Sequence, residues 1–153
     1  MPDGKNANIA AFVISYPTGP MRIIVRYFFR AVRLILTPFM LLSEKLTTPK
    51  AIARSEEEQR AAEQAATKLA LYQYRACPFC IKVRKEMARL GLPVEKRDAL
   101  KNPIYRKELQ QQGGKIKVPC LKIDQENGQA LWLYESEQIK AWLQQRFEPG
   151  SVA

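Results

Sequence analysis

The sequence predicts a mixed α/β (α+β) fold, in which strands and helices follow in the order βαβαββα behind an N-terminal helical extension. Apolar runs of strand length alternate with helix-forming runs between residues 69 and 147. An Asn-Gly pair near the end of this region predicts a hairpin between the last two strands. The extension differs in charge: residues 1–54 hold eight Lys/Arg and two Asp/Glu, whereas residues 55–153 hold seventeen and thirteen. At 153 residues, the chain has room for one ordinary domain plus this extension.

The first strand and helix of the predicted domain enclose a pair of cysteines. Leu69–Tyr74 has the pattern of a buried strand, and Ile81–Leu90 that of a helix ending at Gly91, a residue type common after helix C-termini. The motif Cys77-Pro78-Phe79-Cys80 lies between them. A C-x-x-C motif at a strand-to-helix turn is typical of a thioredoxin-like redox site.

The position of the motif predicts different roles for its two thiols. Unpaired N–H groups and the helix dipole stabilise an anion at a helix N-terminus, so Cys77 is predicted to be the nucleophilic thiolate. Cys80 lies one turn further into the helix and is predicted to be the resolving thiol. Pro78 suits the first helical turn, where its missing N–H has no partner to lose. Because the chain has three cysteines and no histidine, it cannot supply four Cys/His ligands to a closed zinc site, and no metal site is predicted.

The remaining elements follow from local signals. A proline is common at the first position of a helix, and paired glycines end one, so Pro103 and Gly113-Gly114 bound a second helix. The hairpin at Asn127-Gly128 joins the last two strands as antiparallel neighbours. In order, these elements are a short strand over Leu92–Arg97, a helix over Asn102–Gln112, strands over Val118–Ile123 and Ala130–Leu133, and a final helix from Glu135 to Phe147.

Residues 21–46 are predicted to form a basic, apolar helix that associates with a membrane, preceded by a poorly ordered segment over residues 1–20. Four arginines recur at spacings of four, four and three, which places them in one narrow stripe, while apolar residues fill the wider remaining face. Pro38 is expected to kink or end this helix. The four arginines are Arg22, Arg26, Arg30 and Arg33.

Three interpretations of this helix compete. A membrane-spanning helix over Ile23–Leu42 is long enough, but its three arginines cost about 8 kcal/mol against about 5 kcal/mol gained from its apolar residues. An interfacial helix would place the apolar face in lipid and the arginines on anionic headgroups. A helix that packs on the domain or on another subunit has the same pattern. We favour an anionic membrane surface as the partner of residues 21–42, because so wide an apolar face exceeds what one small domain needs to cover.

Two other readings of the extension are not supported by its pattern. A secretory signal peptide would carry its charges before the apolar run and small residues after it, which this segment does not. No nucleic-acid partner is predicted, because the basic residues are interleaved with aliphatic ones rather than clustered on a polar surface.

Residues 47–68 are predicted to be a linker and a spacer helix, followed by the redox domain over residues 69–148. The segment Ser55–Glu58 forms an S-x-x-E capping box, which opens an Ala/Glu/Gln-rich helix that runs to about Lys68. Low apolar content favours an exposed spacer, but the first helix of the domain fits the same residues. The sequence does not separate these two interpretations.

Three motifs in the right order and spacing carry a family resemblance. They are LYQYRACPFC, then KVPCL some forty residues later, then LYES before the terminal helix. The region Leu69–Phe147 resembles a glutaredoxin, of the branch close to glutathione-transferase N-terminal domains. The basic apolar extension before such a domain resembles a group of bacterial glutaredoxin-like proteins. The resemblance implies a thioredoxin-like sheet sandwiched by helices.

The resemblance also implies a glutathione site. In glutaredoxins the residue before a cis-proline pairs its backbone with the cysteinyl part of glutathione, which here implicates Val118 and Pro119. An acidic-Ser pair at a helix N-terminus binds the γ-glutamyl end, and Glu135 and Ser136 match that position. The residues implied by the dithiol motif itself are Pro78 and Phe79.

Two positions depart from the family pattern. Many glutaredoxins have a cation for the glycine carboxylate three residues before the nucleophile, where this chain has Tyr74. Arg75, Lys115 and Lys117 are the alternatives, of which we predict Arg75 and Lys117. The second departure is Cys120, directly after Pro119, where a free buried thiol is the commoner case.

The predicted function is that of a glutathione-dependent thiol–disulfide oxidoreductase, with glutathione as co-substrate and protein thiols or disulfides as partners. Cys77 would attack a protein disulfide or a protein–glutathione mixed disulfide, and Cys80 or a second glutathione would resolve the intermediate. Two alternatives stay open: an iron–sulfur cluster carrier that uses Cys77 and glutathione from two chains, and a redox-sensing module without fast turnover. The predicted location is the cytoplasm, peripheral on the inner face of the membrane.

Overall fold

The computed structural model describes residues 20–149, with side chains from residue 23 onward. Residues 1–19 of the segment that was predicted to be poorly ordered lie outside the described residues. The side chain of Arg22 is also outside them. The chain divides into two compact units after residue 36. The second unit contains the whole α/β domain.

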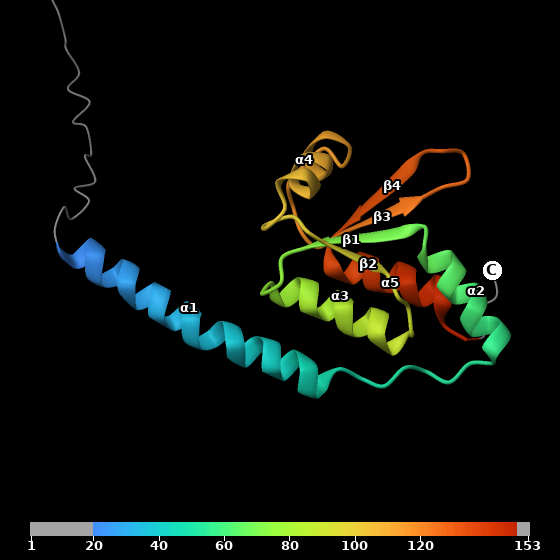
Figure 1. The fold of residues 1–153 in the computed structure, drawn as a ribbon, viewed down its shortest axis with the longest axis horizontal. Helices are drawn as coiled ribbons and strands as arrows, with labels where there is room; N and C mark the ends of the chain where they lie inside the picture. The colour runs from blue at the N-terminus through green and yellow to red at the C-terminus, as the bar shows by residue number, and fades with distance from the viewer. Residues whose placement is uncertain (1–19, 150–153) are drawn as a thin grey trace, which may run out of the picture. The chain divides into compact units, whose positions relative to one another are not determined.

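The domain is built on a four-stranded sheet with the strand order β2-β1-β3-β4 (Figure 1). The central strand β1 pairs in parallel with β2 and antiparallel with β3, which in turn pairs antiparallel with β4. The predicted order βαβαββα is confirmed. Its elements are β1 (Leu69–Gln73), α3 (Pro78–Arg89), β2 (Glu95–Asp98), α4 (Pro103–Gln111), β3 (Cys120–Asp124), β4 (Ala130–Tyr134) and α5 (Ser136–Phe147).

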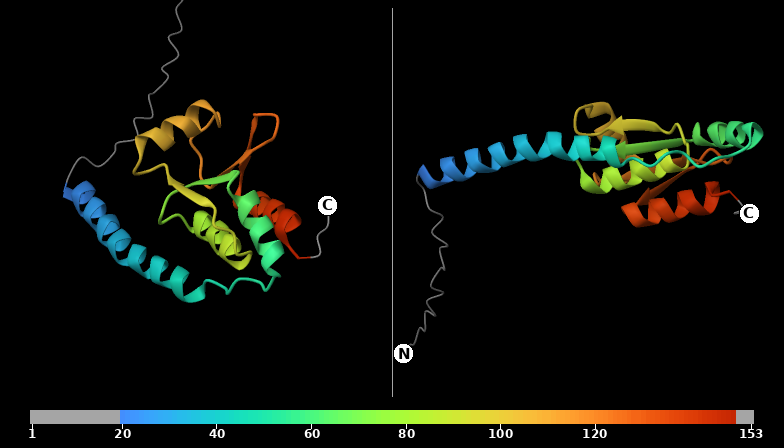
Figure 2. Two further views of the ribbon diagram at one scale, coloured as in Figure 1. Left: turned by 45° about the vertical axis from the view of Figure 1, so that its right-hand side comes forward. Right: turned by 90° about the horizontal axis from the view of Figure 1, so that it is seen from below.

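Helices cover both faces of the sheet (Figure 2), as the thioredoxin-like fold requires. Successive residues of a strand point to opposite faces, so alternate residues of β1 enter two different cores. Leu69 and Leu71 pack with α3 and α5 in the larger core, whereas Ala70 and Tyr72 pack with Leu109 of α4 on the other side. Helix α3, which carries the dithiol, is thereby fixed against the sheet through Val83 and Met87, among others.

The hairpin between β3 and β4 forms where the Asn-Gly pair predicts it. Gly128 has a φ of 77°, a conformation that glycine adopts readily and other residues rarely do. The Gln125 N–H donates to the Gln129 carbonyl at 2.9 Å and closes the turn. Two strands start later than predicted: β2 begins at Glu95 rather than Leu92, and β3 begins at Cys120 rather than Val118, after the proline that cannot donate to the ladder.

Helix α2 (Glu56–Ala66) is the first helix of the domain rather than a spacer. The predicted capping box is present: the Ser55 hydroxyl accepts from the Glu58 N–H, and the Glu58 carboxylate accepts from the Ser55 N–H. Ala62 and Ala66 are buried in the larger core. The redox domain therefore begins before residue 69, and small side chains account for the low apolar content that favoured a spacer.

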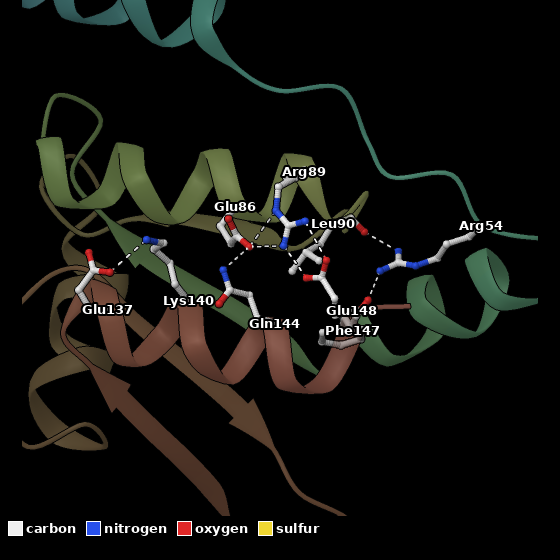
Figure 3. A network of polar contacts seen from close by, with 9 residues as sticks. All are labelled: Arg54, Glu86, Arg89, Leu90, Glu137, Lys140, Gln144, Phe147 and Glu148. Atoms are coloured by element: carbon white, nitrogen blue, oxygen red, sulfur yellow. Dashed lines mark hydrogen bonds and ion pairs between the residues drawn. The ribbon is translucent and has the colours of Figure 1, made fainter. Parts of the chain in front are cut away.

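A polar network joins α3, α5 and the segment before α2 (Figure 3). Arg89 donates to both carboxylate oxygens of Glu148 and to Glu86, which also accepts from Gln144 at 2.9 Å. Burial raises the pKa of Glu86, but the hydrogen bonds from Arg89 and Gln144 outweigh it and hold this pKa below its usual range. Arg54 donates to the carbonyls of Leu90 and Phe147, where α3 and α5 end. These contacts close the end of the domain opposite the dithiol.

Helix α1 (Pro20–Thr47) crosses the division between the two units and contains Pro38 without ending there. Of the two effects expected of Pro38, an end to the helix is wrong, because the regular helix continues for two further turns to Thr47. None of the described helices is both long and apolar enough to cross a membrane. The large apolar side chains exposed along α1 are Ile23, Ile24, Val25, Tyr27, Phe28, Phe29, Leu34, Ile35, Leu36, Phe39, Leu42 and Leu46.

Candidate functional site

The two thiols of the C-x-x-C motif stand at the start of α3 in unequal surroundings. Cys77 is the N-cap residue, with extended backbone and a half-buried side chain, and Pro78 occupies the first helical position. The Cys77 N–H donates to the Tyr74 carbonyl at 3.1 Å, which fixes the turn between β1 and α3. Cys80, one turn on, is completely buried, and both thiols are free. Cys77 is therefore the sulfur that a substrate can reach.

The surroundings of Cys80 favour its protonated form. Burial is the main cause that raises the pKa of this thiol to about 12, and its hydrogen bond to Cys77 adds to the rise. A hydrogen bond with the Tyr74 backbone and the charge of Arg84 act in the opposite direction. Cys80 is thus a neutral, hidden thiol at neutral pH, as a resolving residue can be until its neighbour forms a mixed disulfide.

The peptide bond between Val118 and Pro119 is cis, which confirms the prediction from the sequence. A groove of about 390 Å³ lies beside it, bounded by α3, the segment that leads into β3, and the start of α5. Six of the predicted glutathione-binding residues line this groove, together with two residues that the sequence did not single out. The lining residues are Phe79, Lys82, Lys117, Val118, Pro119, Glu135, Ser136 and Glu137.

Two ion pairs cross this groove. Lys117, before the cis-proline, pairs with Glu135, the N-cap residue of α5, and the hydrogen bond from Lys117 holds the pKa of Glu135 below its usual range. Lys82 of α3 lies 3.6 Å from the Glu137 carboxylate, and its ammonium is 5.7 Å from the centre of the Phe79 ring. The groove therefore carries cations on α3 and on the segment before β3, and anions at the start of α5, which suits a ligand that has charges of both signs.

Lys82 and Glu137 were not predicted as site residues, because a charged residue at either position is typical of an ordinary solvent-exposed helix surface. Lys82 follows Phe79 by three residues on α3, a spacing that puts two side chains on one helical face. Glu137 follows Ser136 in the first turn of α5, where an acidic residue is common for helix stability alone. Their spacing is a usable signal only after the groove residues are known.

Arg75 does not line the groove. It borders a separate polar pocket of about 430 Å³, which Glu44, Gln73 and Arg84 also line. The predicted cation Lys117 is in the groove, whereas Lys115 lies with its ammonium 4.4 Å from the centre of the Tyr134 ring. The prediction that Arg75 shares a site with Lys117 is therefore corrected, since Arg75 follows β1 on the other side of the motif.

Cys120 is completely buried at the start of β3, in the smaller core. Burial is the main cause that raises the pKa of its thiol to about 12, against the opposing effects of Tyr134 and Lys115. Tyr134 donates its hydroxyl to the Gly113 carbonyl at 2.8 Å and lies against Cys120. A neutral thiol in this setting is a packing residue. Among the described residues, no group of three or more His, Cys, Asp or Glu side chains is placed to hold a metal ion.

Residues 69–127 match the family model Glutaredoxin. This part of the chain is thus similar to glutaredoxins. The matched segment begins at β1 and includes the dithiol motif, the cis-proline and the turn after β3. This similarity supports a glutathione-related thiol oxidoreductase type of function for the domain, and suggests glutathione binding.

Solved structures similar to the chain include enzymes longer than the glutaredoxin-like region. One is maleylacetoacetate isomerase from Anaeromyxobacter dehalogenans 2CP-1 with bound GSH in its active site, at 32% identity and a TM-score of 0.41 over 54% of this chain and 39% of that one. Another is glutathione transferase Omega 3C from Trametes versicolor, at 20% identity and a TM-score of 0.43 over 63% and 39%. The chain thus spans well under half of each. No curated protein matches the chain.

Proposed function

We propose that this domain, which is similar to glutaredoxins over residues 69–127, is a glutathione-dependent thiol–disulfide oxidoreductase. The observation that carries the proposal is the pairing of a half-buried Cys77 at the N-cap of α3 with a buried Cys80 one turn on. A reachable first sulfur and a hidden second sulfur suit a reaction in which the first attacks a substrate and the second waits for the intermediate.

The reaction begins with the Cys77 thiolate attacking the glutathione sulfur of a protein–glutathione mixed disulfide. A disulfide forms between Cys77 and glutathione, and the protein thiol leaves as a thiolate and takes up a proton. A second glutathione then attacks the glutathione sulfur bound to Cys77, which yields glutathione disulfide and restores Cys77. In the dithiol route, Cys80 attacks Cys77 instead, and glutathione leaves.

The groove beside the cis-proline is the proposed glutathione site. Val118 precedes β3, which begins at Cys120, so its backbone lies before the paired part of the strand and can pair with the cysteinyl part of glutathione. Ser136 begins α5, whose N-terminal N–H groups suit the carboxylate of the γ-glutamyl end. Lys117 and Lys82 supply positive charge, and Glu135 supplies negative charge for the γ-glutamyl ammonium. The zwitterionic character of glutathione matches this mixture.

The assignment of the two sulfurs is tested with single substitutions in the full chain. A protein carrying one glutathione mixed disulfide is the substrate, and glutathione release is measured. Cys77→Ser should lose more than about 99% of the turnover, since it lacks the nucleophile. Cys80→Ser should retain glutathione release by the monothiol route. Cys120→Ser is the matched control and should behave as the wild-type chain; turnover that survives in Cys77→Ser contradicts the proposal.

We further propose that the apolar face of α1 rests on an anionic membrane surface. The supporting observation is that large apolar side chains are exposed along the whole helix, among them Phe28 at 61% and Ile35 at 70%. Arg26, Arg30 and Arg33 add positive charge to the same helix, which complements anionic headgroups. The double variant Phe28→Glu/Ile35→Glu should lose cosedimentation with vesicles that contain phosphatidylglycerol, whereas Glu56→Gln should keep it. Equal cosedimentation of both variants contradicts the proposal.

A further inference from the structure

Near the dithiol, the Arg84 side chain donates hydrogen bonds to three other residues of the described chain. It lies on α3 four residues after Cys80, a spacing that puts both on one face of the helix. Its side chain is only 9% exposed. A buried guanidinium needs its donors satisfied and its charge compensated, so its partners identify what it holds in place.

Three other segments of the chain meet at this guanidinium. Nε and Nη2 each donate at 2.6 Å to one carboxylate oxygen of Glu44, in the last turn of α1. Nη1 donates at 2.6 Å to the side chain of Gln73, at the end of β1, and Nη2 also donates at 3.0 Å to the Arg75 carbonyl in the loop before Cys77. One side chain therefore ties the end of α1 to the loop that carries the first sulfur.

The same charge acts on the second sulfur. Among the described residues, the charged or titratable groups that act on the Cys80 thiol are Cys77, which disfavours its thiolate, and Arg84, which favours it. Glu44 opposes this effect because its carboxylate neutralises the guanidinium through two hydrogen bonds. The carboxylate is itself 18% exposed, so solvent screens the pair only partly.

We propose that Glu44 is a positioning residue that acts through Arg84 to set the reactivity of Cys80, so that the end of α1 controls the resolving step. The inference rests on the proposed function, in which Cys80 attacks the Cys77 sulfur of the mixed disulfide. In that step the bond between Cys80 and Cys77 forms, the bond between Cys77 and glutathione breaks, and glutathione leaves as the thiolate. The step needs Cys80 to give up its proton, and Arg84 stabilises the charge that develops.

Two substitutions should move Cys80 in opposite directions. Glu44→Gln keeps the shape of the side chain and removes its charge, so Arg84 acts more strongly and Cys80 ionises at lower pH. Arg84→Met removes the cation and should make Cys80 ionise at higher pH. We expect the ionised fraction of Cys80 at pH 8 to rise about threefold or more in the first variant and to fall by a similar factor in the second. A purely structural loss of packing would shift both variants in the same direction.

The experiment measures the iodoacetamide reaction at Cys80 against pH in the full chain, with Cys77→Ser and Cys120→Ser in every variant so that one thiol remains. The midpoint of the profile, and not its plateau, is compared, because exposure changes the plateau. Glu126→Gln is the matched charge control, since Glu126 is exposed and pairs only weakly with Lys68. It should leave the midpoint unchanged. If Glu44→Gln does not fold, Glu44→Asp keeps the charge at a greater distance and should give a smaller shift in the same direction.

Midpoints that stay unchanged, or that move together in both variants, overturn the inference. The measurement needs no turnover and therefore does not depend on the proposed function. A chain with opposite shifts but no glutathione release would contradict the oxidoreductase and leave the charge coupling in place. A chain with full turnover but no shifts would support the oxidoreductase and contradict the charge coupling.

Discussion

Lys117 and Glu135 form an ion pair across the groove beside the cis-proline, joining the segment before β3 to the N-cap of α5. The two residues stand eighteen positions apart in the chain. Both are about half exposed, so the pair contributes little to stability and remains accessible to a ligand. This accessibility is what the proposed glutathione site requires.

Replacing this lysine should weaken substrate binding without slowing the sulfur chemistry. Lys117→Met removes a cation from the groove but touches neither thiol, so we expect KM for a glutathione-containing mixed disulfide to rise about tenfold and kcat to change less than about twofold. Because Lys117 holds the pKa of Glu135 below its usual range, that carboxylate stays ionised at pH 5, and KM should be constant between pH 5 and 7 as far as Glu135 is concerned.

The matched control is Lys68→Met, since Lys68 is an exposed lysine that pairs with Glu126 outside the groove. Steady-state kinetics of the wild-type chain, Lys117→Met and Lys68→Met give the KM and kcat values to compare. A KM in Lys117→Met equal to that of Lys68→Met would show that the groove does not bind the substrate through this charge.

The burial of α2 can be tested with two glutamates placed five residues apart. Ala66 is 1% exposed in the larger core, so Ala66→Glu buries an unpaired carboxylate and should lower the free energy of unfolding by about 3 kcal/mol or more. Ala61 is exposed on the same helix, and Ala61→Glu should change the free energy of unfolding by less than about 0.5 kcal/mol. Urea unfolding measures both. Equal small effects would mean that α2 is a spacer after all.

The network around Glu86 should make stability depend on acid. The lowered pKa of Glu86 means that its contribution is present above the unfolded value of 4.5 and is lost as pH falls through the folded value. Glu86→Gln should therefore cost about 1–3 kcal/mol at pH 7, where Arg89 loses a charged partner, and progressively less as pH falls below 4.5. Unfolding curves at several pH values check this, and a cost that does not change with pH would contradict the ionic role shown in Figure 3.

The two buried thiols should make the domain sensitive to alkali. Burial raises the pKa of both Cys80 and Cys120 to about 12, above the reference value of 9.0. The unfolded chain thus releases these protons first, and the free energy of unfolding should fall above pH 9, by up to about 1.4 kcal/mol per pH unit for each thiol. Cys120→Ala should remove one of the two contributions. The window from pH 9 to 10 is the informative one, because the buried tyrosines begin to contribute above it.

Local sequence signals predicted most of the fold because each depends on residues that are neighbours in the chain. The alternation of apolar residues identified the strands, Asn127-Gly128 identified the hairpin, and Ser55 with Glu58 identified the start of α2. The cis-proline and the residues of the groove came from motifs, through a family resemblance. Helix α1 runs through Pro38 to Thr47, close to the predicted bounds of residues 21–46, because the strong helix propensity on both sides of the proline competes with the cost of a proline inside a helix.

The C-x-x-C motif, its place at a strand-to-helix turn and the unequal surroundings of its two sulfurs were determined by the sequence alone, since a helix N-terminus is a local structure. Only the tertiary structure decided which charges surround them. It put Lys82 and Glu137 in the groove, moved Arg75 out of it, and brought Glu44 to Arg84 over a separation of forty residues. Such contacts depend on how helices pack across the sheet, and no pattern of neighbouring residues encodes that geometry.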